Sequence, residues 1–267
     1  RSRGLGDVYK RQIWYFAVRS DELKLGRLLS LKLLGEPIVL GRQKTGQPFA
    51  LRDICPHRGI PLSDGRLIND ELECCYHGWR FNSEGTCICI PSLTEDQNLE
   101  LTRIKVPNYP IQELSGCIWI FMPSDFRNME LKKIPPTVPD AFSKPAMTEK
   151  LTFPCHIDHA VIGLMDPAHG PFVHQSWWWR SRKSVHTKSK VFGPTDLGFA
   201  MLKHKPSSNS LAYKILGRDI ETEITFRLPG TRIETIHVGR NLVVGLTTVT
   251  PIDRTTCLLY TSDAADE

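Results

Sequence analysis

The chain has 267 residues, of which 40% are hydrophobic and 24% charged, and its formal net charge is +5. So mild a positive excess, without a basic arm or a binding motif, argues against a nucleic-acid partner. No run of eighteen apolar residues is present, so the sequence predicts no membrane span. The eight cysteines are spaced too irregularly for a disulfide framework, which favours a reducing cytoplasm.

The two ends of the chain do not look like natural protein sequence. SRGLGDVYKRQ, within residues 1–12, and CLLYTSDAADE, residues 257–267, are what translation of paired transposon-type sequencing adapters produces. Such segments are set aside before fold reasoning. We therefore expect the natural insert to span 13–256, cut at both ends, with neither biological terminus present.

Residues 13–125 consist of short apolar or alternating runs separated by turn residues, the pattern of a mostly β domain. About 110 residues are enough for one small hydrophobic core. We expect strands at 13–18, 38–40, 49–51, 71–76, 87–90 and 117–122.

Two motifs in this domain combine cysteine with histidine. Cys55-x-His57 is followed, after sixteen residues, by Cys74-x-x-His77. Two thiolates and two imidazoles that arrive as two pairs suit a Rieske [2Fe–2S] cluster, in which one iron binds both cysteines and the other both histidines. A tetrahedral zinc ion can use the same four residues, and zinc remains the alternative.

The residues around these ligands favour the cluster. Gly59 and Gly78 follow the two histidines closely, where backbone N–H groups must approach cluster sulfurs, and Trp79 can limit solvent access. The stretch CPHRG…CCYHGWRF resembles the Rieske domain of the aromatic-ring-hydroxylating and demethylating oxygenases. In the Rieske protein of respiratory cytochrome complexes each loop carries an extra cysteine for a disulfide, whereas Ile60 stands at that position of the first loop. Cys75 replaces the usual proline of the family, which leaves the four ligands intact.

A change in composition marks the boundary of a second domain. Residues 126–150 contain four prolines among lysines and aspartates, typical of a stiff linker. Beyond it, residues 151–256 alternate apolar and polar positions with turn signals. We expect antiparallel strands at 220–228, 233–238 and 242–249.

A second candidate metal site opens this domain, in Asp166-x-x-His169-x-x-x-x-His174. Two histidines five residues apart do not share a helix face, but Gly170-Pro171 between them is expected to break the helix and let the rings converge. Two imidazoles and one carboxylate form the facial triad of non-haem Fe(II). Alone, this spacing is a weak signal, and ordinary core or surface histidines are the alternative. His156 and His159 lie i, i+3, and second-shell or surface roles are expected for them.

The segment LMDxxH with VH at the second histidine resembles the phthalate-type branch of the same oxygenases, which includes vanillate and dicamba demethylases. The resemblance implies that His169 and His174 bind mononuclear iron. It also implies that Asp166 bridges a Rieske histidine of one subunit to an iron-binding histidine of the next, in a homotrimer. Gly163 and Ile162 occupy positions where many members of the family have asparagine.

The third iron ligand, a carboxylate, is not assigned. In the family it follows the histidine pair by well over a hundred residues, so it is expected beyond residue 256. Asp196, Asp219 and Asp253 are present in the second domain, and none of them is chosen.

These observations predict an α+β chain: a mostly antiparallel β Rieske [2Fe–2S] domain followed by a truncated helix-grip-type catalytic domain. The resemblance implies the terminal oxygenase component of a Rieske non-haem iron oxygenase, which hydroxylates or oxidatively demethylates a small organic substrate with O₂. A flavin reductase, a ferredoxin or both would supply electrons from NAD(P)H. The alternatives are a Rieske electron carrier and a degenerate paralogue without an iron site.

Overall fold

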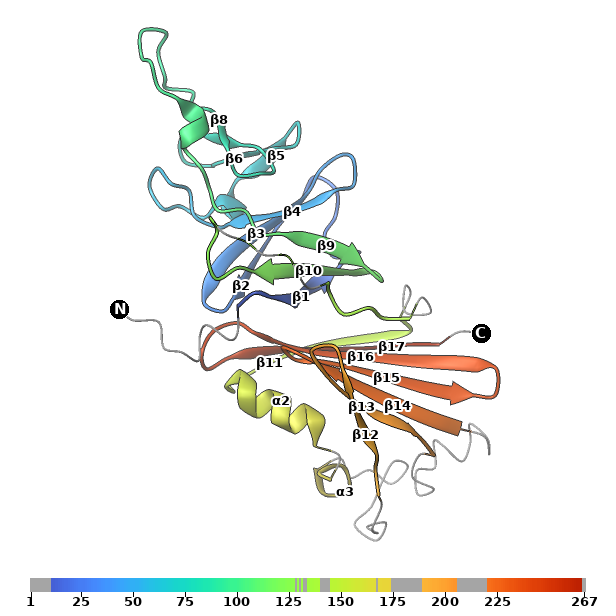
Figure 1. Ribbon diagram of the computed structural model, residues 1–267. Helices are drawn as coiled ribbons and strands as arrows, with labels where there is room; N and C mark the ends of the chain where they lie inside the picture. Colours follow the sequence, from blue (N-terminus) through green and yellow to red (C-terminus); the bar gives the residue numbers. More distant parts are fainter. Residues whose placement is uncertain are drawn as a thin grey trace. The chain divides into compact units, whose positions relative to one another are not determined.

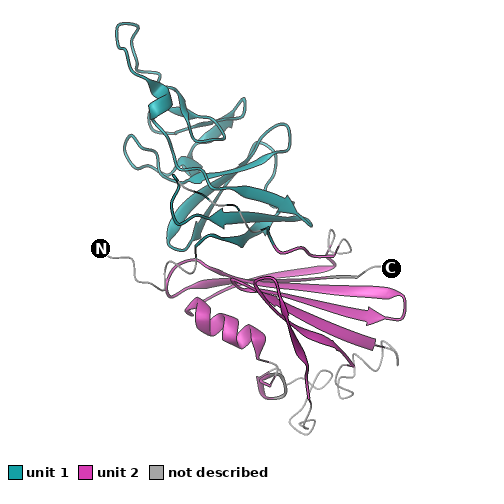
Figure 2. Ribbon diagram, in the orientation of Figure 1, with its two compact units in different colours: residues 1–135 teal, residues 136–267 magenta. Residues whose placement is uncertain are grey.

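The computed structural model describes residues 11–127, 129, 131, 134–139, 145–166, 168–173, 189–205 and 220–265. The chain divides into two compact units, residues 1–135 and 136–267 (Figures 1 and 2). Strand pairing in both units is antiparallel throughout the described residues. The predicted fold class, mostly antiparallel β with little helix, is confirmed.

The first unit contains three small sheets. One has the order β1-β10-β9, the second β2-β3-β4 and the third β5-β6-β7-β8. Their bounds are β1 (Ile13–Arg19), β2 (Leu28–Leu33), β3 (Glu36–Arg42), β4 (Pro48–Arg52), β5 (Arg66–Ile68), β6 (Glu71–Glu73), β7 (Arg80–Phe81), β8 (Cys87–Cys89), β9 (Ile111–Leu114) and β10 (Cys117–Met122). Two 3₁₀ turns, η1 (Leu62–Asp64) and η2 (Leu101–Arg103), join them.

The strands expected in this unit are present, with one difference. The strand expected over 71–76 ends at Glu73, and the next residue, Cys74, donates its N–H to the Trp79 carbonyl directly after the Glu73–Arg80 pair of β6 and β7. A loop therefore begins at the first ligand of the second motif.

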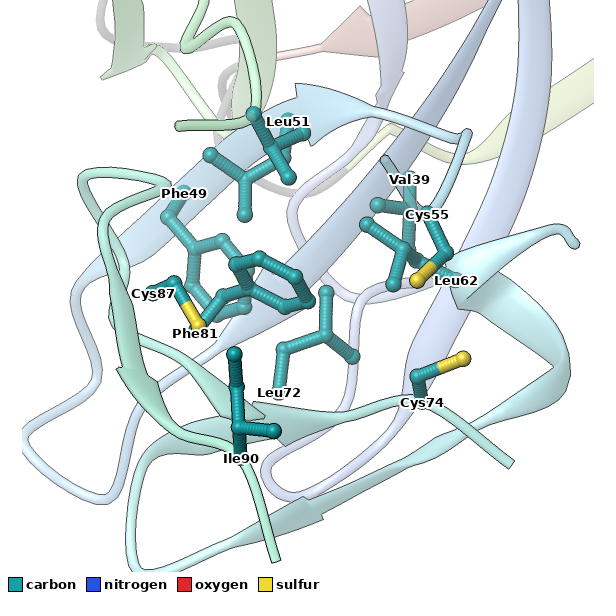
Figure 3. Close-up of a cluster of buried hydrophobic side chains, with 11 residues drawn as sticks. Val39, Phe49, Leu51, Cys55, Leu62, Leu72, Cys74, Phe81, Cys87 and Ile90 are labelled. Atoms are coloured by element: carbon teal, nitrogen blue, oxygen red, sulfur yellow. The ribbon is translucent and has the colours of Figure 1, made fainter. Parts of the chain in front are cut away.

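A buried apolar cluster lies directly beside the two cysteines of the motifs (Figure 3). Phe81, Leu72 and Leu62 are fully buried within it. Cys55 and Cys74 belong to the same cluster and lie together at one end of it. Close packing of this kind transmits small changes in shape, so the apolar cluster supports the positions of both sulfur atoms.

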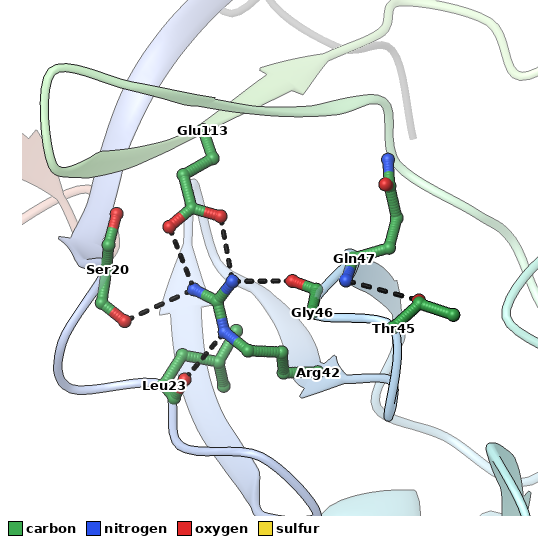
Figure 4. Close-up of polar contacts among 7 residues, drawn as sticks. All are labelled: Ser20, Leu23, Arg42, Thr45, Gly46, Gln47 and Glu113. Carbon is green, nitrogen blue, oxygen red and sulfur yellow. Dashed lines mark hydrogen bonds and ion pairs between the residues drawn. The ribbon is translucent and has the colours of Figure 1, made fainter.

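Arg42, at the end of β3, is the polar clamp of this unit (Figure 4). Its guanidinium donates to the carbonyls of Leu23 at 2.8 Å, Gly46 at 2.6 Å and Ser20 at 3.2 Å. It also binds both carboxylate oxygens of Glu113 at 2.8 and 3.1 Å. The planar fork of arginine thus joins two loops, β1–β2 and β3–β4, to β9, a geometry that the single ammonium of lysine cannot reproduce.

A second buried network surrounds Glu36 on β3. Its carboxylate accepts hydrogen bonds from Tyr109 at 2.5 Å, Arg11 at 2.5 Å and Arg52 at 3.2 Å. Burial by itself raises the pKa of Glu36, but the Tyr109 hydroxyl and the two guanidinium groups outweigh it and hold the pKa below its ordinary value.

Within its described residues, the second unit is one seven-stranded sheet with two helices. The strand order is β11-β17-β16-β15-β14-β13-β12. The bounds are β11 (Met147–Phe153), α2 (Ile157–Met165), α3 (Gly170–Val173), β12 (Phe192–Thr195), β13 (Gly198–His204), β14 (Ile220–Arg227), β15 (Thr231–Val238), β16 (Asn241–Pro251) and β17 (Cys257–Ala265). The three strands expected after residue 219 are all present.

Helix α2 lies against one face of this sheet. The side chain of Val161 reaches within 3.4 Å of where a Cβ on Gly230 would sit, and Val249 packs at the same place. The tightest approach is that of the Val249 carbonyl oxygen, 2.7 Å from the same Cβ position, so the path of β16 is what requires glycine there. Helix α2 ends at Met165, and Asp166 follows as its C-cap.

Strand β17 contains nine residues that the sequence analysis assigns to an adapter. It pairs with β16 on one side and with β11 on the other, and Cys257 and Tyr260 are buried. Backbone pairing requires only a suitable alternation of side chains, so this position in the sheet says nothing about the origin of the residues.

No helix in the described part of the chain is long and apolar enough to cross a membrane.

Replacing Arg42 by lysine is expected to lower the free energy of unfolding by roughly 2–4 kcal/mol, because several part-buried carbonyls and the Glu113 carboxylate lose donors. Urea unfolding measures this loss. The matched control is Arg66→Lys, since Arg66 is 73% exposed in its ion pair with Glu73 and such pairs contribute about 0–1 kcal/mol. Equal losses in the two variants would contradict the clamp.

Glu36→Gln is expected to remove part of the acid sensitivity of the fold. Because the folded-state pKa of Glu36 is lowered, its contribution to stability is present above the unfolded-state pKa and is lost as the pH falls through the folded-state pKa. Urea midpoints measured between about pH 6 and about pH 3 should therefore fall less steeply in the variant. Parallel curves would show that Glu36 does not carry the effect.

Candidate metal centre

Two loops carry the Cys/His motifs, and both are closed by the same pair of backbone hydrogen bonds. In the first loop, the Gly59 N–H donates to the Cys55 carbonyl at 2.8 Å and the Cys55 N–H donates to the Ile60 carbonyl at 2.8 Å. The second loop repeats both bonds at equivalent residues, Gly78 to Cys74 at 3.1 Å and Cys74 to Trp79 at 2.8 Å. Each cysteine is therefore the residue at which its loop closes.

Glycine is needed at the same point of each loop. Gly59 has φ +76° and Gly78 has φ +70°, in the left-handed region that costs other residues roughly 1–2 kcal/mol. A Cβ at Gly59 would meet open space, whereas one at Gly78 would lie 3.0 Å from Pro91 Cγ. The positive φ of the turn accounts for glycine at both positions. At Gly78 the close approach of Pro91 is a second reason why no side chain fits.

The four predicted ligands come together as two pairs. Cys55 and Cys74 are 2% and 3% exposed, and burial together with the neighbouring Cys74 thiol raises the pKa of Cys55 to about 11. The rings of His57 and His77 lie edge to face with centroids 4.6 Å apart. Thiols on one side and imidazoles on the other match a cluster with one iron for each pair.

The surroundings of His57 test whether these residues fit such a cluster. Its Nδ1 atom is buried and has no hydrogen-bond partner, and a buried polar atom left unpaired is costly unless it binds something. Burial, followed by the nearby His77 and Arg58, lowers the pKa of His57, which favours the neutral ring that binds metals. Trp79 stacks on this ring at 4.6 Å and 3° and covers one side of it.

Within the described residues, no three His, Cys, Asp or Glu side chains converge on one point as a single metal ion requires. The assignment of a cluster rests on two neighbouring pairs, Cys55 with Cys74 and His57 with His77. The residues present fit a [2Fe–2S] cluster.

The second predicted site is described in part. His169 Nδ1 lies 2.6 Å from the Asp166 carbonyl oxygen and 3.7 Å from its carboxylate. The carboxylate also accepts from the Ala168 N–H at 2.8 Å. A hydrogen bond from Nδ1 to the carbonyl would leave Nε2 of His169 as the atom able to bind a metal. His174 lies outside the described residues.

The expected break in the helix is displaced. Gly170 and Pro171 do not end a helix but begin the short helix α3, while α2 ends earlier, at Met165. Proline is tolerated in a first helical turn, where its missing N–H has no partner to lose. The irregular segment therefore carries Asp166 and His169 themselves.

The sequence analysis did not single out Asp53. It is 4% exposed and stands two residues before Cys55, at the end of β4. The available signal in the sequence was an acidic residue between an apolar run and a ligand motif. A carboxylate buried at such a place needs hydrogen-bond partners.

Replacing Cys55 by serine should abolish the bound iron and acid-labile sulfide, which are expected at two of each per chain in the parent protein. Iron and sulfide analysis with the visible spectrum measures this. Cys75→Ser is the matched control, since Cys75 is an exposed free thiol in the second loop. Zinc in place of iron would contradict the assignment.

Gly59→Ala should cost about 1–2 kcal/mol of unfolding free energy through backbone strain alone. Gly78→Ala should cost more, because its Cβ also meets Pro91. Urea unfolding of the cluster-free protein compares the two without a contribution from metal. The opposite order would contradict the packing at Gly78.

Comparison with known proteins agrees with this geometry. Residues 13–110 match the model of the Rieske [2Fe–2S] domain. Chlorophyllide a oxygenase of Chlamydomonas reinhardtii is 34% identical over 190 residues, which cover 67% of this chain and 28% of that protein. The oxygenase component of dicamba O-demethylase from Stenotrophomonas maltophilia is 34% identical over 228 residues, 84% of this chain and 57% of that protein.

Solved structures extend the likeness to the second unit. Dicamba monooxygenase bound to dicamba superimposes with a TM-score of 0.76 at 26% identity, over 95% of this chain and 77% of that one. The chain spans about a quarter to somewhat over half of the length of the curated relatives that it matches. Its described residues share the fold of the dicamba enzyme, and residues 13–110 are a Rieske [2Fe–2S] domain.

Proposed function

We propose that the chain is part of the terminal oxygenase component of a Rieske non-haem iron oxygenase. The observation that carries the proposal is the contact between Asp166 and His169 at the end of α2, in a chain that also holds the Rieske domain. An electron carrier needs the first unit alone and has no use for such a pair.

The residues of the chain have distinct tasks in this proposal. Cys55 and Cys74 bind one iron of the cluster as thiolates, and His57 and His77 bind the other as neutral rings. His169, with His174, holds the mononuclear iron, and Asp166 orients His169 through its carbonyl and carboxylate oxygens. When bound, the cluster supplies electrons singly and the mononuclear iron activates O₂.

Asp166 also has the chemistry of a link between the two metal sites. A carboxylate can accept N–H groups from two imidazoles at once and fix the tautomer of both. Its side chain is 42% exposed, so a second imidazole can reach it. We place a Rieske histidine of a neighbouring subunit there, in a homotrimer.

The proposed reaction is hydroxylation or oxidative demethylation of an aromatic or similar small organic molecule. Relatives named as a dicamba O-demethylase, a 3-chlorobenzoate-3,4-dioxygenase and a 4beta-methylsterol monooxygenase support this breadth. The LMDxxH match favours the phthalate/vanillate-demethylase-like branch. A flavin reductase, a ferredoxin or both would deliver electrons, in the cytoplasm.

The alternative is a Rieske electron carrier or a degenerate paralogue. Ile162 is 65% exposed and Gly163 faces open space, at positions where many family members have asparagine. The absence of asparagine at both positions is the observation that favours a paralogue without an iron site.

His169→Ala in the full-length protein separates these functions. In an oxygenase the variant should lose product formation, by a hundredfold or more, while its cluster is still reduced at the parent rate. His159→Ala is the matched control, because His159 lies on the same helix α2 and no role in iron binding is assigned to it. A carrier would transfer electrons to an external acceptor equally well in all three proteins.

We further propose that residues 1–12 and 257–267 are adapter-encoded and that 13–256 is the natural insert, with the linker at 126–150 and the partial catalytic domain at 151–256. Genomic DNA flanking the insert should continue in frame past Thr256 and encode an acidic residue about a hundred residues on, as the third iron ligand. A stop codon directly after Thr256 would favour the carrier or the degenerate paralogue.

A further inference from the structure

Asp53 forms a second closure of the first cluster loop, made by side chains. Its carboxylate accepts hydrogen bonds from the Ser63 N–H at 2.7 Å and from the Ser63 hydroxyl at 2.6 Å. The Ser30 hydroxyl of β2 donates to it at 3.0 Å. Asp53 stands two residues before Cys55 and Ser63 six residues after His57, so the carboxylate joins the two ends of the loop that carries both ligands.

The Asp53 carboxylate is surrounded by groups that can donate to it: one backbone N–H, which can only donate, and two serine hydroxyls. Among the described residues Asp53 has no cationic partner, since the neighbouring Arg52 pairs with Glu36 at 3.2 Å. Asp53 is 4% exposed, so water screens its charge weakly.

A fixed negative charge here has a consequence for the redox centre. Two thiolates and two neutral imidazoles give the oxidised cluster, whose core is 2+, a net charge of zero. Addition of one electron takes the core to 1+ and the whole site to −1. A nearby buried anion therefore disfavours the reduced state.

We propose that Asp53 is a positioning residue for the Rieske centre: it closes the first ligand loop and its buried charge lowers the reduction potential of the cluster. The role is independent of what the second unit does. It applies equally to an oxygenase and to an electron carrier.

The test is the midpoint potential of the cluster in the whole chain, measured by redox titration with optical and electron paramagnetic resonance detection. Asp53→Asn keeps the size of the side chain and removes the charge, so the potential should rise, with the equilibrium constant for reduction increasing roughly three- to thirtyfold. Asp64→Asn is the matched control: it removes the same charge from an exposed residue of η1 and should leave the potential nearly unchanged.

A second variant keeps the proposal testable if Asp53→Asn does not assemble a cluster. Ser30→Ala removes one donor from the carboxylate without altering the loop itself, so the charge is less well compensated and the potential should fall. Opposite shifts in Asp53→Asn and Ser30→Ala support the electrostatic role. A rise in Ser30→Ala, or a parent-like potential in a cluster-bearing Asp53→Asn, would overturn it.

Discussion

Two backbone turns of the same design carry the predicted cluster ligands of this protein. In each turn, a glycine with positive φ donates its N–H to the carbonyl of the cysteine four residues earlier. The N–H of that cysteine donates to the carbonyl of the residue that follows the glycine. Each closed loop carries one cysteine and one histidine. Because the two loops have the same closure, Cys55 lies beside Cys74 and the ring of His57 lies beside that of His77. The sheets of the first unit hold the two loops in that relation.

Side-chain hydrogen bonds from three residues help to keep the loops of the first unit in position. Arg42 joins two loops to β9, the Glu36 carboxylate binds two guanidinium groups and a phenol, and Asp53 connects the two ends of the first ligand loop. In so small a unit the buried apolar cluster beside Cys55 and Cys74 is limited in size. Directional contacts therefore define the loop geometry, and the apolar cluster excludes water from the sulfur side.

The second unit places its candidate metal-site residues on an irregular segment. Helix α2 contacts the sheet near Gly230 and ends at Met165, so that Asp166 and His169 follow it outside a regular helix. Local hydrogen bonds orient His169 there.

The β character of both domains and the loop glycines were readable from the sequence, since each depends on residue type and local spacing. The ligand residues and the Asp166–His169 motif were predicted from the same local spacing. The tertiary structure decided what local spacing cannot express. The pairing of His57 with His77 and the stacking of Trp79 arise only when separate loops meet. The end of the strand at Glu73 and the helix start at Gly170 depend on which partners the backbone finds. The charge of Asp53 became significant only through its burial, because a carboxylate in water would be screened and one enclosed by serines is not.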